Sequence, residues 1–190
     1  ENWDALREEV RNDYVILGAS HAGVFDYEDM NARLEQMTGS TILNLSNVGA
    51  GITPNRLMLD YFLARHQTAA VIYVLDSFVF YSKEWNEDRL KDTRLFDRAP
   101  FDWTLAAALF KNPATRSVGL DYLSGFSKIN NADRFKPDVR DDERRFNATY
   151  RPIPQIDRQR MAYLYPKQVD QALYKRYLAE FDDLIRDVRS

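Results

Sequence analysis

The chain of 190 residues contains no cysteine and only two histidines, His21 and His66. The missing thiols exclude disulfides, thiolate metal sites and cysteine nucleophiles. Two histidines are too few for a histidine-rich metal site. We therefore expect a functional site without a metal or other cofactor.

The sequence also lacks a long apolar run and an excess of positive charge. No run of about 18 apolar residues is present, so no segment is a candidate membrane span. The net charge is −3, which gives no reason to expect a nucleic-acid partner, because phosphate binding needs clustered Lys and Arg. No signal peptide is visible, and Glu1 is not an initiator methionine, so we expect the chain to derive from a longer parent protein.

Three short apolar runs predict β-strands over residues 14–17, 41–45 and 70–75. Helical patterns at residues 26–37 and 53–66 lie between them. Strands that alternate with helices in this way predict a parallel sheet with right-handed crossovers. The third run is almost entirely apolar, which is typical of a strand buried on both faces.

After the third strand the regular alternation stops. We expect a long irregular and helical insertion at about residues 77–166, with one helix near residues 101–110. Apolar residues recur at helical spacing in a final helix over residues 167–189. The sequence therefore predicts one α/β domain over residues 1–190, a flavodoxin-like three-layer fold that is incomplete, because such a helix normally leads into a further strand.

The first predicted strand breaks into a turn of small residues, Gly18-Ala19-Ser20-His21-Ala22-Gly23. A strand that ends in this way holds the Ser20 hydroxyl at the carboxyl edge of the sheet, where open α/β folds bind ligands. Two chemistries fit these residues. Either Ser20 is a nucleophile, or Gly18 and Gly23 belong to a glycine loop that binds phosphate.

Two blocks at the ends of neighbouring strands carry a family resemblance: Gly18-Ala19-Ser20 and Asn44-Leu45-Ser46-Asn47-Val48-Gly49. With the third apolar strand, this layout resembles the SGNH/GDSL hydrolase family, whose members have a flavodoxin-like fold and hydrolyse or transfer acyl groups. The resemblance implies Ser20 as the nucleophile, with its own backbone N–H in the oxyanion hole. Asn44 and Gly49 match the family's second block, in which the glycine N–H also faces the oxyanion.

The third block differs from the family pattern. The family has an Asn there whose amide donates to the oxyanion, whereas this sequence has Asp76. An ionised carboxylate would repel an oxyanion, so Asp76 contributes either when protonated or by orienting a base. The family's carboxy-terminal Asp-x-x-His is absent, and adjacent side chains such as those of Ser20 and His21 usually diverge. We therefore expect the general base to lie beyond Ser190.

The resemblance implies a serine esterase or O-acyltransferase that acts on acyl esters of an extracytoplasmic glycan or lipid. It is greatest to membrane-tethered members that assist O-acylation, so a membrane-bound acyltransferase is the implied partner and the periplasm or cell surface the implied location.

Two alternatives remain. One is a non-catalytic module of the same fold that binds or assembles components of polysaccharide modification. The other is a nucleotide-binding oxidoreductase. The segment after the glycine loop, Phe25-Asp26-Tyr27-Glu28-Asp29, disfavours it, because these residues are bulky and acidic whereas such a loop is followed by a small, apolar helix.

Aromatic residues follow the third strand at Phe78, Phe80, Tyr81 and Trp85. Two interpretations are open for them. They line a substrate cleft at the sheet edge, or they pack the insertion onto the sheet.

Overall fold

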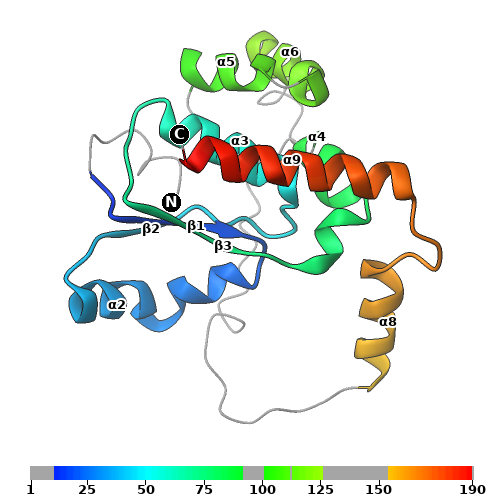
Figure 1. Cartoon of the computed structure of the whole chain (residues 1–190), viewed down its shortest axis with the longest axis horizontal. Coiled ribbons are helices and arrows are strands. Elements are labelled where there is room, and N and C mark those ends of the chain that lie inside the picture. Colours follow the sequence, from blue (N-terminus) through cyan, green and yellow to red (C-terminus); the bar gives the residue numbers. More distant parts are fainter. Residues whose placement is uncertain (1–10, 92–100, 112, 126–153, 190) are drawn as a thin grey trace.

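The computed structural model shows a parallel three-stranded sheet at the centre of the molecule (Figure 1). It describes residues 11–91, 101–111, 113–125 and 154–189. The strands are β1 (Tyr14–Gly18), β2 (Ile42–Asn44) and β3 (Ala70–Val74). The predicted α/β fold with a parallel sheet is confirmed.

The strand order is β2-β1-β3, so β1 is central. Val15 of β1 pairs with Leu43 of β2 and with Val71 of β3. Val15 and Leu17 are fully buried, and Ile16 is 2% exposed. An uncharged apolar run suits this position, because helices cover both faces of a central parallel strand.

Helices cover the two faces of the sheet and complete three layers. Between β1 and β2 the chain forms η1 (Ala22–Asp29) and α2 (Met30–Thr38), which lie on one face. Between β2 and β3 it forms α3 (Ile52–Leu63), which lies on the opposite face beside the long final helix α9 (Gln171–Arg189) (Figure 1).

Where the structure describes the segment after β3, its regular elements are helices, and the helix expected near residues 101–110 is α5. Residues 92–100, 112 and 126–153 of the expected insertion lie outside the described residues. In chain order the further elements are η2 (Ser77–Phe80), η3 (Glu84–Asp88), α4 (Arg89–Lys91), α5 (Trp103–Lys111), η5 (Pro113–Thr115), α6 (Arg116–Ser124) and α8 (Pro154–Leu164).

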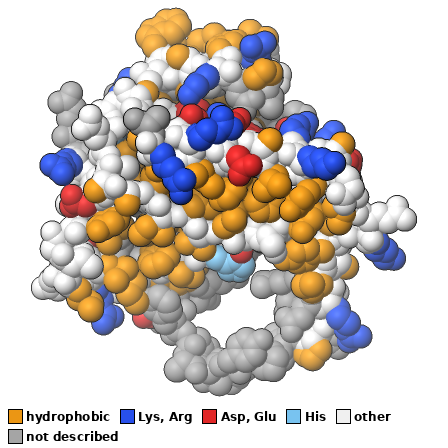
Figure 2. Space-filling view, in the orientation of Figure 1, with side chains coloured by type: hydrophobic (Ala, Val, Ile, Leu, Met, Phe, Trp, Pro, Cys, Tyr) orange, Lys and Arg blue, Asp and Glu red, His pale blue; other side chains and the backbone are white. Residues whose placement is uncertain are grey.

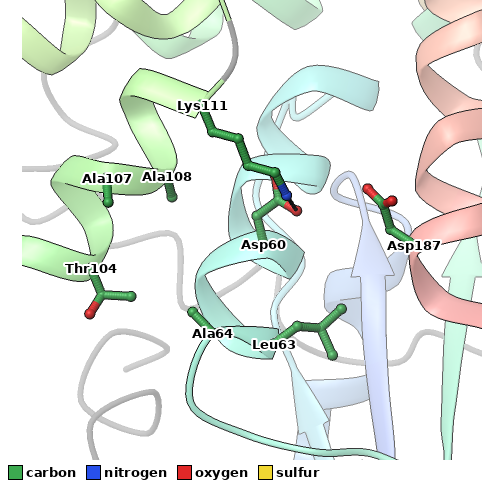
Figure 3. A pocket seen from close by; sticks show the side chains of 8 residues that line it. All are labelled: Asp60, Leu63, Ala64, Thr104, Ala107, Ala108, Lys111 and Asp187. Atoms are coloured by element: carbon green, nitrogen blue, oxygen red, sulfur yellow. Dashed lines mark hydrogen bonds and ion pairs between the residues drawn. The ribbon is translucent and has the colours of Figure 1, made fainter. Parts of the chain in front are cut away.

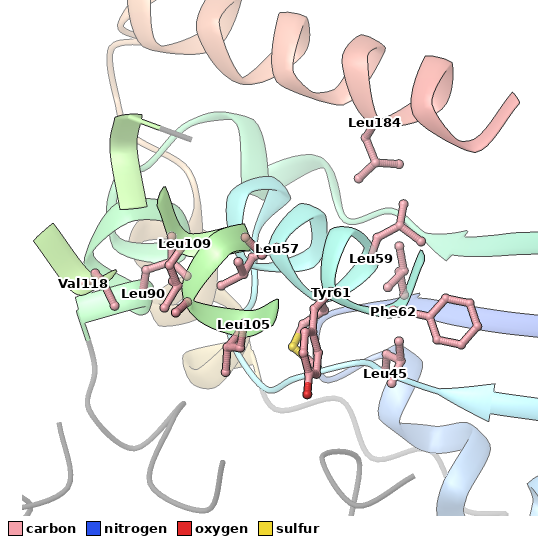
Figure 4. Packing of buried hydrophobic residues seen from close by; sticks show 14 of the residues in the cluster. Leu45, Leu57, Leu59, Tyr61, Phe62, Leu90, Leu105, Leu109, Val118 and Leu184 are labelled. Atoms are coloured by element: carbon pink, nitrogen blue, oxygen red, sulfur yellow. The ribbon is translucent and has the colours of Figure 1, made fainter. Parts of the chain in front are cut away.

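The main hydrophobic core is built around α3. Figure 4 shows its side chains between those of α5 and α6 on one side and Leu184 of α9 on the other. Leu59 and Phe62 of α3 are at most 1% exposed. Full burial of a side chain of this size contributes about 1.5–3 kcal/mol, so these contacts hold the helical layer on the sheet. The further buried core residues on the neighbouring elements include Leu45, Leu90, Leu105, Leu109 and Val118.

The prediction that β3 is buried on both faces is wrong. Ile72 is 43% exposed, whereas Val71 and Tyr73 are partly buried and pack against the core. Successive side chains of a strand point to opposite faces, and β3 is an edge strand of the described sheet. One of its faces therefore stays open to solvent despite its apolar composition.

Exposed hydrophobic side chains gather over α5 and α6, at the top of the space-filling view (Figure 2). Trp103 is 72% exposed and Leu120 is 62% exposed. Within the described part of the chain, no helix combines the length and the apolar character needed to cross a bilayer.

A buried carboxylate links α3, α5 and α6. Asp102 Oδ2 accepts a hydrogen bond of 2.6 Å from the Tyr61 hydroxyl, and both Asp102 oxygens contact the Arg65 guanidinium at 2.6 and 2.7 Å. The Asp102 backbone N–H donates to the Tyr122 oxygen at 2.8 Å. Burial alone would raise the pKa of Asp102, but hydrogen bonds from Tyr61, the Thr104 N–H and Arg65 outweigh it and lower the pKa below its usual value.

Replacing Asp102 with Asn is expected to destabilise the fold by about 2 kcal/mol at pH 7, because charge-assisted hydrogen bonds to a buried group are lost. A carboxylate with a lowered pKa stabilises the fold above its unfolded-state pKa of about 4, and this contribution is lost as the pH falls through the folded-state pKa. The difference in the free energy of unfolding between wild type and Asp102→Asn should therefore shrink below about pH 4, as measured by urea unfolding. Asp182→Asn, at an exposed position, is the control. An equal difference in unfolding free energy between wild type and Asp102→Asn at pH 3 and at pH 7 would contradict a stabilising role of the Asp102 carboxylate.

Candidate functional site

The carboxyl edge of the sheet brings the sequence-predicted residues together. After β1 the chain crosses to the β2 side, whereas β3 lies on the other side of β1. The carboxyl ends of β1 and β3 therefore border the point where the strand order reverses, which is where open α/β sheets bind ligands. Ser20 and His21 follow β1, and Asp76 follows β3.

His21 and Asp76 form a close pair at this edge. His21 Nδ1 lies 2.6 Å from Asp76 Oδ1. The imidazole side chain is 66% exposed, whereas the Asp76 side chain is 16% exposed. A carboxylate at Nδ1 holds the proton on that nitrogen, so Nε2 is left as a proton acceptor. This is the arrangement of the base and its orienting acid in Ser-His-Asp hydrolases.

The two oxygens of the Asp76 carboxylate differ in their hydrogen bonding. Asp76 Oδ2 is buried and has no hydrogen-bond partner among the described residues. His21 is thus the one side chain of the described structure that donates to this carboxylate. A carboxylate held against Nδ1 stabilises the imidazolium that forms when Nε2 takes up a proton. The pair is therefore suited to stabilise an imidazolium during proton transfer.

Ser20, the residue before His21, is exposed, and its hydroxyl has no hydrogen bond to any described residue. The turn closes on itself through its backbone: the Ala22 N–H donates to the Ala19 carbonyl and the Gly23 N–H to the Ser20 carbonyl, each at 3.1 Å. These two N–H groups are consequently occupied. A phosphate loop needs such groups free, so the turn geometry favours the serine interpretation over the phosphate one.

Gly49 lies in the neighbouring loop between β2 and α3. Its φ angle is +71°, in the left-handed region, and a Cβ here would lie 3.1 Å from the Trp85 ring. The loop is tied to β1 because the Asn47 N–H donates to the Gly18 carbonyl at 3.2 Å. The Gly51 N–H donates to the Trp85 carbonyl. The backbone around Gly49 is thereby fixed between β1 and η3.

The Asn44 side chain is not exposed at the carboxyl edge but lies buried behind it, where it makes hydrogen bonds to η1. Its side chain is buried, and Nδ2 donates to the Ala22 carbonyl and to Asp26 Oδ2, both at 3.0 Å. Its Oδ1 accepts the Ser46 N–H. Asn44 thus ties η1, the segment that follows Ser20, to the end of β2.

The aromatic residues after β3 make packing contacts, which favours the interpretation that they pack the insertion onto the sheet. Phe78 and Phe80 are buried in a second apolar cluster with Tyr177 of α9, so they pack the insertion onto the sheet. Tyr81 is partly exposed and packs against Tyr165, whose hydroxyl is 2.7 Å from Ser77 Oγ.

A separate cavity of about 520 Å³ lies between α3, α5 and α9 (Figure 3). Asp60 and Lys111 face one another in it at 3.1 Å, and Asp187 is paired with Arg56. Because α3 begins at the carboxyl edge of the sheet and runs back, this cavity lies near the other end of the helix. Its charged groups are already paired, and it holds none of the residues predicted from sequence. Among the described residues, no cluster of three or more His, Asp or Glu could hold a metal ion.

Sequence reasoning missed the contact between His21 and Asp76. The available signal was positional: Asp76 follows a strand next to β1, so its side chain lies at the same sheet edge as the turn after β1. His66, the other histidine, is buried and stacked on Phe62.

Gly18 is expected to be indispensable to this arrangement. Its φ is +150°, and a Cβ would meet the Ala22 Cβ at 2.7 Å and the Val74 carbonyl oxygen at 2.8 Å. Gly18→Ala should therefore destabilise the chain by about 2–4 kcal/mol. Gly23→Ala is the matched control, because a Cβ at Gly23 meets nothing within 4 Å. Thermal unfolding of both variants tests this, and equal melting temperatures would refute it.

Comparison of the chain with models of protein families, with curated proteins and with solved structures finds no match. The geometry of the carboxyl edge and the sequence resemblance are therefore the basis on which a function can be proposed.

Proposed function

We propose that the carboxyl edge of the sheet is a serine acyl-transfer site. Ser20 is the nucleophile, His21 is its general base, and Asp76 orients and stabilises the imidazole. The observation that carries the proposal is the 2.6 Å contact between His21 and Asp76 beside an exposed serine at the point where the strand order reverses.

The reaction follows from these roles. Ser20 Oγ attacks the acyl carbonyl while His21 Nε2 takes the hydroxyl proton, and Asp76 stabilises the imidazolium. The N–H groups of Ser20 and Gly49 donate to the oxyanion. The alcohol leaves with the proton from His21, and the acyl-serine is then cleaved by water or by an acceptor hydroxyl. Hydrogen bonds between nucleophile and base are often long or poorly aligned before substrate binds and tighten in the complex.

The substrate class in this proposal is an acyl ester of an extracytoplasmic glycan or lipid, and the activity is that of an esterase or an O-acyltransferase. Both the substrate class and the activity are inferred from the resemblance of Gly18-Ala19-Ser20 and of the Asn44–Gly49 block to SGNH hydrolases. If the activity is that of an O-acyltransferase, the proposed partner is a membrane-bound acyltransferase.

One observation favours a second candidate function, a non-catalytic module of the same fold. The Ser20 hydroxyl makes no hydrogen bond to His21 or to any other described residue. In that case the exposed polar groups of the edge bind an acylated glycan without cleaving it.

Covalent labelling separates the two candidates. A fluorophosphonate probe should label Ser20, located by peptide mass spectrometry, because the His21–Asp76 pair activates the hydroxyl. Labelling should be lost in Ser20→Ala and retained in Ser77→Ala, which removes a second exposed serine of the same edge whose hydroxyl is held by Tyr165. Absence of labelling in the wild-type chain would refute the nucleophile role.

Asp76→Asn tests how the nucleophile is activated. If Asp76 orients the base, the labelling rate should fall by about a hundredfold or more, because an amide does not stabilise the imidazolium. If position 76 instead contributes an oxyanion donor, as the family's Asn does, the same change should raise the rate. A rate equal to or above that of the wild type therefore contradicts the triad.

A further inference from the structure

We propose that Asn55 is the positioning residue that sets the separation between the Ser20 and Gly49 N–H groups. This inference rests on the proposed acyl-transfer function, in which these two groups receive the oxyanion. Asn55 lies in the first turn of α3 and is 1% exposed, so it contacts no substrate itself.

The Asn55 side chain joins the two segments that carry the oxyanion donors. Its Oδ1 accepts the Gly18 N–H at 3.0 Å, two residues before Ser20. Its Nδ2 donates to the Gly51 carbonyl at 2.8 Å and to the Ala50 carbonyl at 3.3 Å, just after Gly49. One planar amide thus spans the gap between the end of β1 and the loop after β2.

An amide is required for this task because it accepts and donates through the same rigid group. A carboxylate at position 55 could accept from Gly18 but would repel the two carbonyl oxygens. An apolar side chain would suit the surrounding core but would remove the partner of the Gly18 N–H and the side-chain donor to the Ala50 carbonyl, and it would leave the Gly51 carbonyl with only the residue 55 backbone N–H at 3.3 Å. The three hydrogen bonds offset the cost of burying the amide, so the polar group is stable inside an otherwise apolar layer.

Two backbone hydrogen bonds also join β1 to this loop, and both lie before Gly49. The Leu45 N–H donates to the Ile16 carbonyl at 2.8 Å, and the Asn47 N–H donates to the Gly18 carbonyl at 3.2 Å. The part of the loop after Gly49 is held to β1 by Asn55. Without Asn55, the Asn47–Gly18 and Gly51–Trp85 hydrogen bonds remain, but the side of the loop after Gly49 loses its direct hydrogen bonds to β1. The Gly49 N–H is then held less tightly relative to Ser20, and displacements of about 1 Å are enough to slow a positioned reaction by about a hundredfold.

The test compares phosphonylation of Ser20 in Asn55→Leu and in the wild-type chain. Leu is uncharged and similar in size, so it removes the three hydrogen bonds without adding repulsion. The maximal labelling rate constant should fall at least tenfold, whereas the probe concentration at half-maximal rate should stay unchanged. Asn31→Leu is the matched control, because it removes a hydrogen bond from a side-chain amide to the Ile42 carbonyl, on the opposite face of the sheet. An unchanged maximal rate in Asn55→Leu overturns the inference.

The outcomes separate this inference from the proposed function. An unlabelled wild-type chain refutes the acyl-transfer site itself, whereas a labelled wild type with an equally reactive Asn55→Leu refutes only the role of Asn55. If Asn55→Leu does not fold, Asn55→Asp removes the two donors and keeps the acceptor, with the same expected fall. Hydrogen exchange of the wild type needs no variant: the Gly18 amide should exchange as slowly as that of Ile16, and exchange as fast as at exposed Val48 overturns the inference.

Discussion

The close approach of backbone at Gly18 is the constraint on which the rest of the structure depends. At this residue the end of β1, the end of β3 and the start of η1 meet without room for a Cβ. This contact brings the turn after β1 against β3, and so brings His21 within hydrogen-bond distance of Asp76. A side chain at position 18 would push the two strand ends apart and separate the pair.

Buried asparagines hold the loops at this edge where no regular secondary structure does. Asn44 joins β2 to η1, and Asn55 joins α3 to β1. Asn86 is fully buried; its Oδ1 accepts the Thr53 N–H and its Nδ2 donates to the Val79 and Ser82 carbonyls. Each amide satisfies backbone groups that would otherwise be buried without partners. The turns of the edge are therefore held together by buried hydrogen bonds, as the proposed acyl-transfer site requires of its oxyanion donors.

The sequence predicted the elements that follow from local patterns. Apolar runs located all three strands, and chain order indicated that Ser20 and Asp76 share one sheet edge. It predicted the burial of β3 wrongly, because burial depends on which strands and helices lie next to Ile72 and not on its own composition. The His21–Asp76 contact and the role of Asn55 were missed for a related reason. An asparagine in an amphipathic helix looks the same in sequence whether it faces water or bridges two loops.

The His21–Asp76 pair also has a consequence for how the chain folds. Ser20 and His21 belong to one turn, but their carboxylate partner is 55 residues from His21 along the chain. That contact forms only once the parallel β1–β3 ladder has closed around a complete crossover, and non-local pairings of this kind form slowly. The turn that holds Ser20 and His21 is local in sequence, whereas the contact with Asp76 requires the non-local pairing of β1 with β3. A chain in which β1 and β3 have not paired therefore lacks the His21–Asp76 contact, so the proposed acyl-transfer site would be assembled only in the native structure.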